Sequence, residues 1–106
     1  MFFNYKFAKV STPASGITRR ILAHCPEVML TEHMLEKGAT LPEHEHPHVQ
    51  LVYLVSGELL VEMDGKQFTL KEGDSLSIPS HISHKASALV KSVALDIFAP
   101  RRDDYL

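Results

Sequence analysis

The segment LPEHEHPHVQ, residues 41–50, has three histidines at alternate positions and a glutamine two residues after the last of them. In an extended strand, residues two apart share a face, so His44 and His46 are expected to point the same way. Gln50 joins them if the extended geometry persists past Pro47. Two neutral imidazoles and an amide oxygen can form three sides of a site for a first-row transition metal. The alternative is a surface loop of solvated histidines.

A fourth ligand has to come from another strand, and the segment IPSHISH, residues 78–84, offers His81 and His84. His33, further upstream, either faces the same cavity or is a half-buried structural histidine. The sequence supports either role equally well.

Length and composition describe the molecule that carries these groups. A chain of 106 residues with 44% hydrophobic and 23% charged residues is expected to form one soluble globular domain. Its net charge of -2 gives no electrostatic footprint for nucleic acid or an anionic membrane. Cys25 is the only cysteine, which excludes an internal disulfide. The opening MFFNYKF has no apolar run typical of a signal peptide or membrane span, so we expect a cytoplasmic protein.

The spacing of turn-forming residues along the chain is typical of a β protein. Glycines recur at short intervals, and Asp64-Gly65 between two apolar runs favours a tight hairpin turn. No segment of helical length has a clean 3.6-residue period. Strands are expected at residues 27–36, 50–55, 58–63, 67–70, 75–78 and 91–99. Short strands at this spacing predict an all-β sandwich or barrel.

Two spacings resemble the motifs of the cupin family. The pattern G-x5-H-x-H-x3-Q-x6-G, from residue 38 to residue 57, resembles the first cupin motif, and G-x5-P-x4-H, from residue 73 to residue 84, resembles the second. The resemblance implies a double-stranded β-barrel, or jelly roll, with N-terminal strands over about residues 1–37, a metal-binding barrel over 38–99 and a tail over 100–106. It implies that a divalent metal is bound by His44, His46, Gln50 and His84.

The chain departs from the cupin pattern at Gln50, where most cupins have glutamate. A neutral amide beside three neutral imidazoles leaves a divalent ion its full +2 charge, which makes it a better Lewis acid and a poorer stabiliser of a ferric state. This favours non-redox chemistry. Nickel, zinc, manganese and ferrous iron all suit such a ligand set. His81 occupies the usual glycine position of the second motif and is expected at the rim of the site. His48 is expected to be exposed or to support a ligand.

The C-terminal SVALDIFAPRRDDYL contains a second group of reactive side chains. Along an extended strand, Asp96 and Phe98 lie on one face and Leu95 and Ile97 on the other. If the aliphatic face packs against another layer or a second subunit, Asp96 and Phe98 face the cavity. An aspartate in an apolar barrel is costly unless it is paired or used. Arg102 follows closely. The alternative for Asp96 is an aspartate exposed to water on an edge strand. The alternative for Arg101 and Arg102 is a solvated basic pair near the terminus.

A narrower resemblance covers nearly the whole chain. MFF, RRIL, KGA, GDSLSIPSHISH and DIFAPRRDDYL together resemble the KdgF-type cupins, which open the rings of unsaturated monouronates released from pectin and alginate. The resemblance implies that Asp96, Phe98 and Arg102 are catalytic. Asp96 suits a general acid/base, Arg102 suits a carboxylate and Phe98 suits a wall of the sugar pocket.

Two other functions fit the same motifs. One is a metal-dependent cupin dioxygenase, and the other is a non-catalytic sugar-binding or sensing cupin. Sensing cupins usually carry a DNA-binding domain, for which this chain is expected to have no room. We also expect a homodimer, because a chain this short has apolar residues on both faces of several strands.

Overall fold

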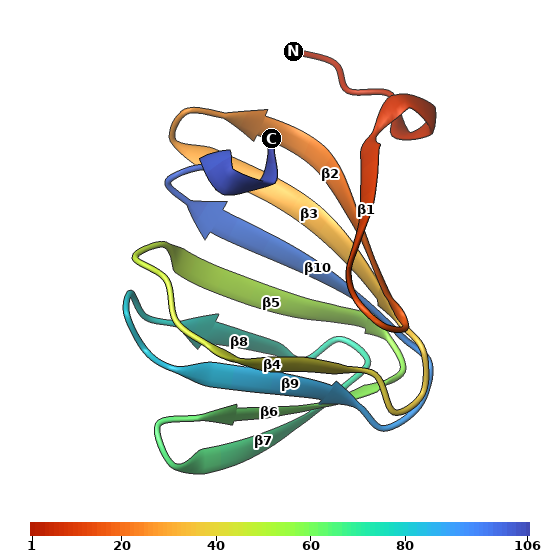
Figure 1. The fold of residues 1–106 in the computed structure, drawn as a ribbon, viewed down its shortest axis with the longest axis vertical. Helices are drawn as coiled ribbons and strands as arrows, with labels where there is room; N and C mark the ends of the chain where they lie inside the picture. Colours follow the sequence, from red (N-terminus) through yellow and green to blue (C-terminus); the bar gives the residue numbers. More distant parts are fainter.

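The computed structural model describes all 106 residues as two antiparallel β-sheets that face each other (Figure 1). The larger sheet has six strands in the order β1 (Lys9–Ala14), β2 (Ile17–Cys25), β3 (Val28–Leu35), β10 (Ser92–Ala99), β5 (Val49–Ser56) and β8 (Ser75–Ile78). The smaller sheet has four strands in the order β4 (Thr40–His44), β9 (His84–Ala88), β6 (Glu58–Met63) and β7 (Lys66–Lys71).

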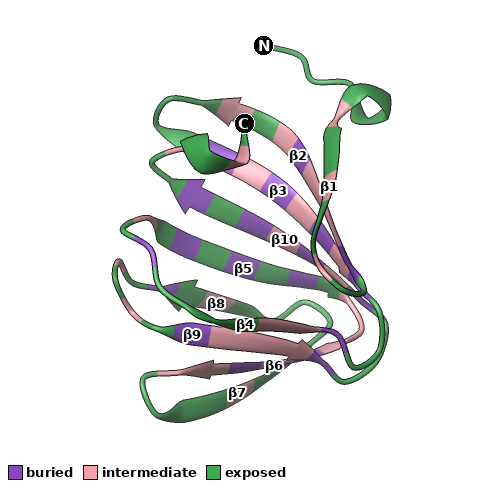
Figure 2. Ribbon diagram, viewed as in Figure 1, coloured by how far each residue is buried: buried purple, intermediate pink, exposed green.

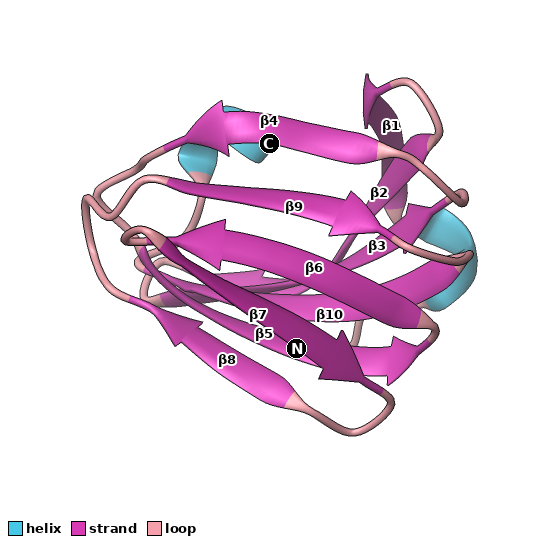
Figure 3. Ribbon diagram, turned by 90° about the horizontal axis from the view of Figure 1, so that it is seen from below, coloured by secondary structure: helices cyan, strands magenta, loops and turns pink.

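Two short 3-10 helices complete the structure, η1 (Tyr5–Phe7) and η2 (Asp103–Tyr105). Figure 3 shows the two sheets as separate layers, with helix only at the periphery. The predicted all-β double-stranded barrel is therefore confirmed. No helix of the structure is both long enough and apolar enough to cross a membrane.

Turns close the barrel where the sequence predicted them. Asp64 and Gly65 join β6 to β7 with φ angles of 52° and 71°, the left-handed values that a two-residue hairpin of this type requires. Gly57, between β5 and β6, has a φ of 95°, and a Cβ atom there would overlap Ser92. The Asp64-Gly65 turn therefore fixes the register of the β6–β7 hairpin within the smaller sheet, and Gly57 lies where the chain crosses from the larger sheet to the smaller one.

The strands of the larger sheet alternate between a buried and an exposed face, which Figure 2 shows along β5 and β10. The inner face packs on the smaller sheet and forms an aliphatic core that includes Ile17, Leu54, Leu59 and Val61. Eight polar side chains are also buried, and they belong to Thr31, His33, His46, Gln50, His84, Ser92, Asp96 and Arg102. Burying so many polar groups is costly unless they are paired with one another or used.

Strand β10 carries the centre of this polar group. It lies between β3 and β5, so each of its inward residues has neighbours on both sides. Asp96 is paired with Thr31 and Val52, and Phe98 with Met29 and Gln50. Asp96 and Phe98 are 5% and 2% exposed, while the intervening Ile97 is 39% exposed. The aspartate is therefore inside the barrel rather than on a solvated edge.

Candidate metal and catalytic site

Three histidines from separate segments converge at one end of the barrel. The nearest ligand atoms of His44, His46 and His84 all lie within 4.8 Å of one another. His44 ends β4 and His84 begins β9, and they are direct cross-strand partners with ring centroids 4.3 Å apart. The ligand atoms of His44 and His46 converge, as their spacing predicts, although β4 ends at His44 and the two residues do not share one strand. His46 lies in the loop that follows, and this loop brings it to the other two.

Each of these imidazoles is held in one orientation by its Nδ1 atom. The three Nδ1 groups face the carbonyl oxygens of Pro42, His48 and Ile82, at 2.9, 3.0 and 2.8 Å. A carbonyl only accepts, so Nδ1 carries the ring proton and Nε2 keeps its lone pair. Burial lowers the pKa of His46 and of His84, which keeps both rings neutral. Nε2 of His84 is buried and has no hydrogen-bond partner.

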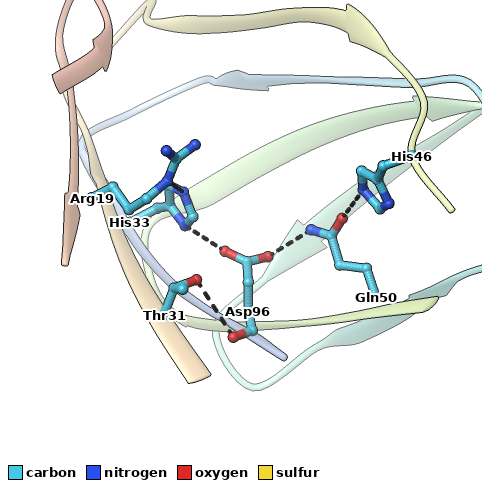
Figure 4. Close-up of polar contacts among 6 residues, drawn as sticks. All are labelled: Arg19, Thr31, His33, His46, Gln50 and Asp96. Atoms are coloured by element: carbon cyan, nitrogen blue, oxygen red, sulfur yellow. Dashed lines mark hydrogen bonds and ion pairs between the residues drawn. The ribbon is translucent and has the colours of Figure 1, made fainter. Parts of the chain in front are cut away.

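Gln50 completes the set with an amide of fixed orientation. Its Nε2 donates to Oδ1 of Asp96 at 3.0 Å, and its Oε1 lies 3.0 Å from Nε2 of His46 (Figure 4). The reverse orientation would set the amide oxygen against the carboxylate. Because neutral His46 carries its proton on Nδ1, two lone pairs face each other here without a proton between them. A bound cation would relieve that contact and would also satisfy the unpartnered Nε2 of His84.

The donor set therefore fits a divalent transition metal, with His44, His46, Gln50 and His84 as the residues that would hold it. Three imidazole nitrogens and one amide oxygen are all neutral donors. These are the four residues that the sequence motifs indicated.

Asp96 accepts hydrogen bonds on both carboxylate oxygens. Gln50 donates to Oδ1, and His33 Nδ1 lies 2.7 Å from Oδ2. On its other side, His33 Nε2 accepts from Nε of Arg19 at 3.2 Å, so the proton of the neutral ring is on Nδ1 and points at Asp96. Figure 4 shows the resulting line of side chains from Arg19 to His46. Of the two roles considered for His33, the structure shows the one in which the side chain faces the cavity.

The register of the larger sheet explains how His33 reaches Asp96. His33 pairs directly with Ala94 on β10 and with Arg19 on β2, and Asp96 is its diagonal neighbour on the same face. Ala94 has only a methyl group, which leaves the imidazole room to lean toward the carboxylate. Sequence reasoning missed the role of Arg19. Its inward position opposite His33 depends on the register of β2, a strand that was not predicted.

Arg102 packs against the same site from the tail. Its Nε and Nη2 donate to the two carboxylate oxygens of Asp104 at 3.0 and 2.9 Å, and this hydrogen bonding lowers the pKa of Asp104. The guanidinium carbon lies 5.0 Å from the ring centroid of Phe98 and 4.2 Å from that of Tyr105. Nη1 of Arg102 is buried without a partner. One donor nitrogen of this arginine thus has no partner within the protein.

A cavity lies between the sheets beside these groups. Half of its lining residues are aliphatic. Its polar or aromatic lining consists of Arg19, His33, His44, Gln50, His84, Asp96, Phe98 and Tyr105. Phe98 packs its ring edge-on against His46, 5.7 Å between centroids, and so separates the histidine cluster from Tyr105. A small polar molecule in this cavity would meet the ligand set and Asp96 together.

The two remaining histidines of the motifs support the site through their backbone. His81 is exposed, with a φ of 63°, and its N–H donates to the carbonyl of His46 at 2.8 Å. The carbonyl of His48 accepts from the His46 ring. Both residues thus shape the loop that presents His46.

Comparison with known proteins identifies the family. Residues 31–98 match the family model described as "Cupin domain". The chain is 32% identical over 93 residues to the pectin degradation protein KdgF of Dickeya dadantii, covering 86% of this chain and 84% of that protein. A polyketide synthase named CurC, from Streptomyces cyaneus, is 36% identical over 53 residues, 49% of this chain and 34% of that one.

Solved structures agree. KdgF from a Halomonas species superposes with a TM-score of 0.92 at 37% identity and covers 100% of this chain and 98% of its own. An RmlC-like cupin from Shewanella frigidimarina gives 0.92 at 31% identity, with 99% and 95% covered. The chain belongs to the cupin family, and within it to the small single-domain cupins that resemble the pectin degradation protein KdgF.

Proposed function

We propose that this protein is an enzyme that opens the ring of unsaturated monouronates released from pectin or alginate, using a bound divalent metal and no redox step. Similarity to KdgF supports a role in processing pectin-derived sugars. The observation that carries the reaction is the buried Asp96, whose carboxylate is joined through one amide to the histidine cluster. A proton carrier and a metal ligand set thus share one cavity.

The substrate is a cyclic enol ether that is also a hemiacetal and bears a carboxylate. Opening the ring breaks the bond between the anomeric carbon and the ring oxygen, removes the proton of the anomeric hydroxyl and delivers a proton to a ring carbon. The product is a linear keto sugar with the same atoms, so no oxidant, reductant or co-reactant is needed. A bound metal would hold sugar oxygens and lower their pKa values.

Asp96 takes and returns the proton in this proposal. The hydrogen bonds from Gln50 and His33 hold both of its oxygens in place, so the carboxylate needs no reorganisation when the sugar binds. Phe98 provides a flat apolar wall for the sugar ring. Arg102 contributes positive charge near the carboxylate of the sugar, and its Nη1 is the donor nitrogen that Asp104 leaves free.

The outer face of the larger sheet supports the homodimer in this proposal. Leu51, Tyr53 and Ile97 are exposed side chains, and together with Leu30 and Leu95 they line an apolar groove across β3, β10, β5 and β8. A contiguous apolar face of this kind marks an interface in soluble proteins. We propose that a second copy of the chain covers it.

The test is decay of the ultraviolet absorbance of 4,5-unsaturated galacturonate or its epimers, with metal-loaded protein purified without an affinity tag. The expected result is a rate above the spontaneous opening that is the same with and without oxygen. Oxygen consumption would instead indicate a dioxygenase. Saturable sugar binding with no acceleration for any unsaturated uronate would indicate a binding protein.

A further inference from the structure

We propose that Arg19 binds the carboxylate of the sugar directly and is the residue that selects uronates over neutral sugars. The inference rests on the proposed function for its substrate class, and it concerns a residue that neither sequence motif contains. Arg19, the third residue of β2, lines the cavity.

Arg19 is the one arginine of the chain without a carboxylate partner. The other three have ion pairs, namely Arg20 with Glu32 at 3.9 Å, Arg101 with Asp103 at 2.7 Å and Arg102 with Asp104 at 2.9 Å. Asp96, the acid of the same cavity, is separated from Arg19 by the His33 ring. The positive charge at the cavity wall is therefore not neutralised by the protein.

The guanidinium is nevertheless held in place. Its Nε donates to His33, and its carbon atom lies 3.6 Å from the centroid of the Tyr105 ring. Neither terminal amino group makes a hydrogen bond within the protein, so both remain available on the edge away from Nε. A planar group with two free, parallel donors matches the two oxygens of a carboxylate.

The local environment strengthens such a contact. Burial lowers the pKa of Arg19, and the charge of Arg102 lowers it further, although an arginine stays charged at neutral pH. An unpaired charge among apolar walls is unfavourable, and an anion that enters the cavity relieves this cost. A neutral sugar cannot do so. The same contact would place the carboxylate next to Tyr105, at the end of the cavity occupied by the His33 and Asp96 chain.

Arg102, by comparison, already forms a two-fold hydrogen-bonded ion pair with a carboxylate of the protein. Asp104 takes two of its donors, which leaves Nη1 alone. Arg102 can offer a ligand only Nη1 and the electrostatic attraction of its charge, whereas Arg19 can bind a carboxylate through two hydrogen bonds. Both guanidiniums lie over the Tyr105 ring, but Arg19 lines the cavity and Arg102 does not.

The experiment compares Arg19→Gln and Arg19→Lys with the matched control Arg20→Gln, whose side chain pairs with Glu32. Binding of D-galacturonate and of D-galactose to the metal-loaded protein is measured by calorimetry, and KM and kcat are measured with unsaturated galacturonate. Loss of a charged hydrogen-bonded pair predicts that Arg19→Gln weakens galacturonate binding about tenfold or more. Galactose binding should stay unchanged, Arg19→Lys should recover part of the affinity, and Arg20→Gln should match wild type.

The outcomes separate this inference from the proposed reaction. Wild-type galacturonate affinity in a folded, metal-loaded Arg19→Gln protein overturns the role of Arg19, whatever the turnover. An equal loss for galactose also overturns it, because it shows damage to the cavity rather than loss of a carboxylate contact. Binding of galacturonate that depends on Arg19, without turnover of any unsaturated uronate, supports the role of Arg19 and overturns the reaction.

Discussion

Gln50 donates from Nε2 to Oδ1 of Asp96 at 3.0 Å while presenting Oε1 to His46, so one side chain joins the metal ligands to the acid. Glutamate, the residue most cupins have here, has no donor. A glutamate would set a second carboxylate against Asp96. The amide is therefore required by its neighbour Asp96 on β10, which is a reason that the motif alone could not give.

Replacement of Gln50 by glutamate should accordingly keep the metal and lose turnover. The variant adds an anionic ligand but places two carboxylates in contact, which raises the pKa of one of them and changes the protonation of Asp96. We expect kcat to fall by about 10²-fold, the lower end of what a general acid/base supplies. Metal content per chain, measured alongside kcat, separates the two effects. Wild-type kcat in Gln50→Glu would contradict the coupling.

Asp96→Asn tests the proton carrier itself. Asparagine has the same size, but its amide must turn an NH₂ group toward either Gln50 or His33, both of which are donors at this position. We therefore expect a loss of kcat of about 10²–10⁴-fold together with about 1–3 kcal/mol lost from the free energy of unfolding. Kinetics and urea unfolding measure these. An Asp96→Asn protein with full activity would exclude the proposed mechanism.

Metal binding should depend on His84 and not on His81, three residues away. His84→Ala removes a ligand whose Nε2 is buried and unpartnered, whereas His81 is exposed and supports the site only through its backbone. Saturating metal at about 100 times its Kd adds about 2.7 kcal/mol to stability. A chelator should thus lower the Tm of wild type and of His81→Ala, and leave that of His84→Ala unchanged. Equal responses of the two variants would rule out this ligand set.

The sequence predicted the barrel and the three histidines that converge in it because both depend on local signals. Strand β6 was predicted with its observed bounds, and the Asp64-Gly65 turn was found from its composition. The unpredicted strands were β1, β2, β4 and β9. These strands are short or carry polar residues toward the cavity, as at Arg19 and His84, so hydrophobic alternation is weak in them.

The support of Asp96 could not be predicted for a different physical reason. His33 lies 63 positions from Asp96 in sequence, and their contact depends on strand register, which spacing does not specify. Tyr105 likewise reaches the cavity only because η2 folds the tail back against Phe98. The residues of each ligand motif lie close together in sequence, whereas the groups that orient Asp96 come together only through the pairing of strands that are distant in sequence.

Self-association should depend on the outer face of the larger sheet. Leu51→Glu places a charge in the groove that a second copy is proposed to cover, and it should convert the dimer to a monomer at micromolar concentration. Val10→Glu, an equally exposed apolar position on edge strand β1, is the matched control and should stay dimeric. Sedimentation velocity measures both. A monomeric wild type would contradict the proposed interface.

Tyr105 links the tail to the two guanidiniums, and its titration shows which force dominates there. Burial raises the pKa of its phenol above 10.0, and the nearby Arg19 and Arg102 only partly oppose this. A pKa that is raised on folding contributes stability that is present below the unfolded value and is lost as pH rises through the folded value. The contribution should therefore be constant near neutral pH and decline only in the alkaline range.

Tyr105→Phe supplies the reference, because it keeps the ring over which both guanidiniums lie. The difference in free energy of unfolding between wild type and Tyr105→Phe should be flat from about pH 7 to 9 and fall above about pH 10, where the unfolded phenol ionises. The difference in absorbance at 295 nm between the two proteins should place the ionisation of Tyr105 above that of a free tyrosine. A phenol that ionises below pH 10 would show that the two cations outweigh burial, and the charge at this end of the cavity would then be partly neutralised by Tyr105 itself.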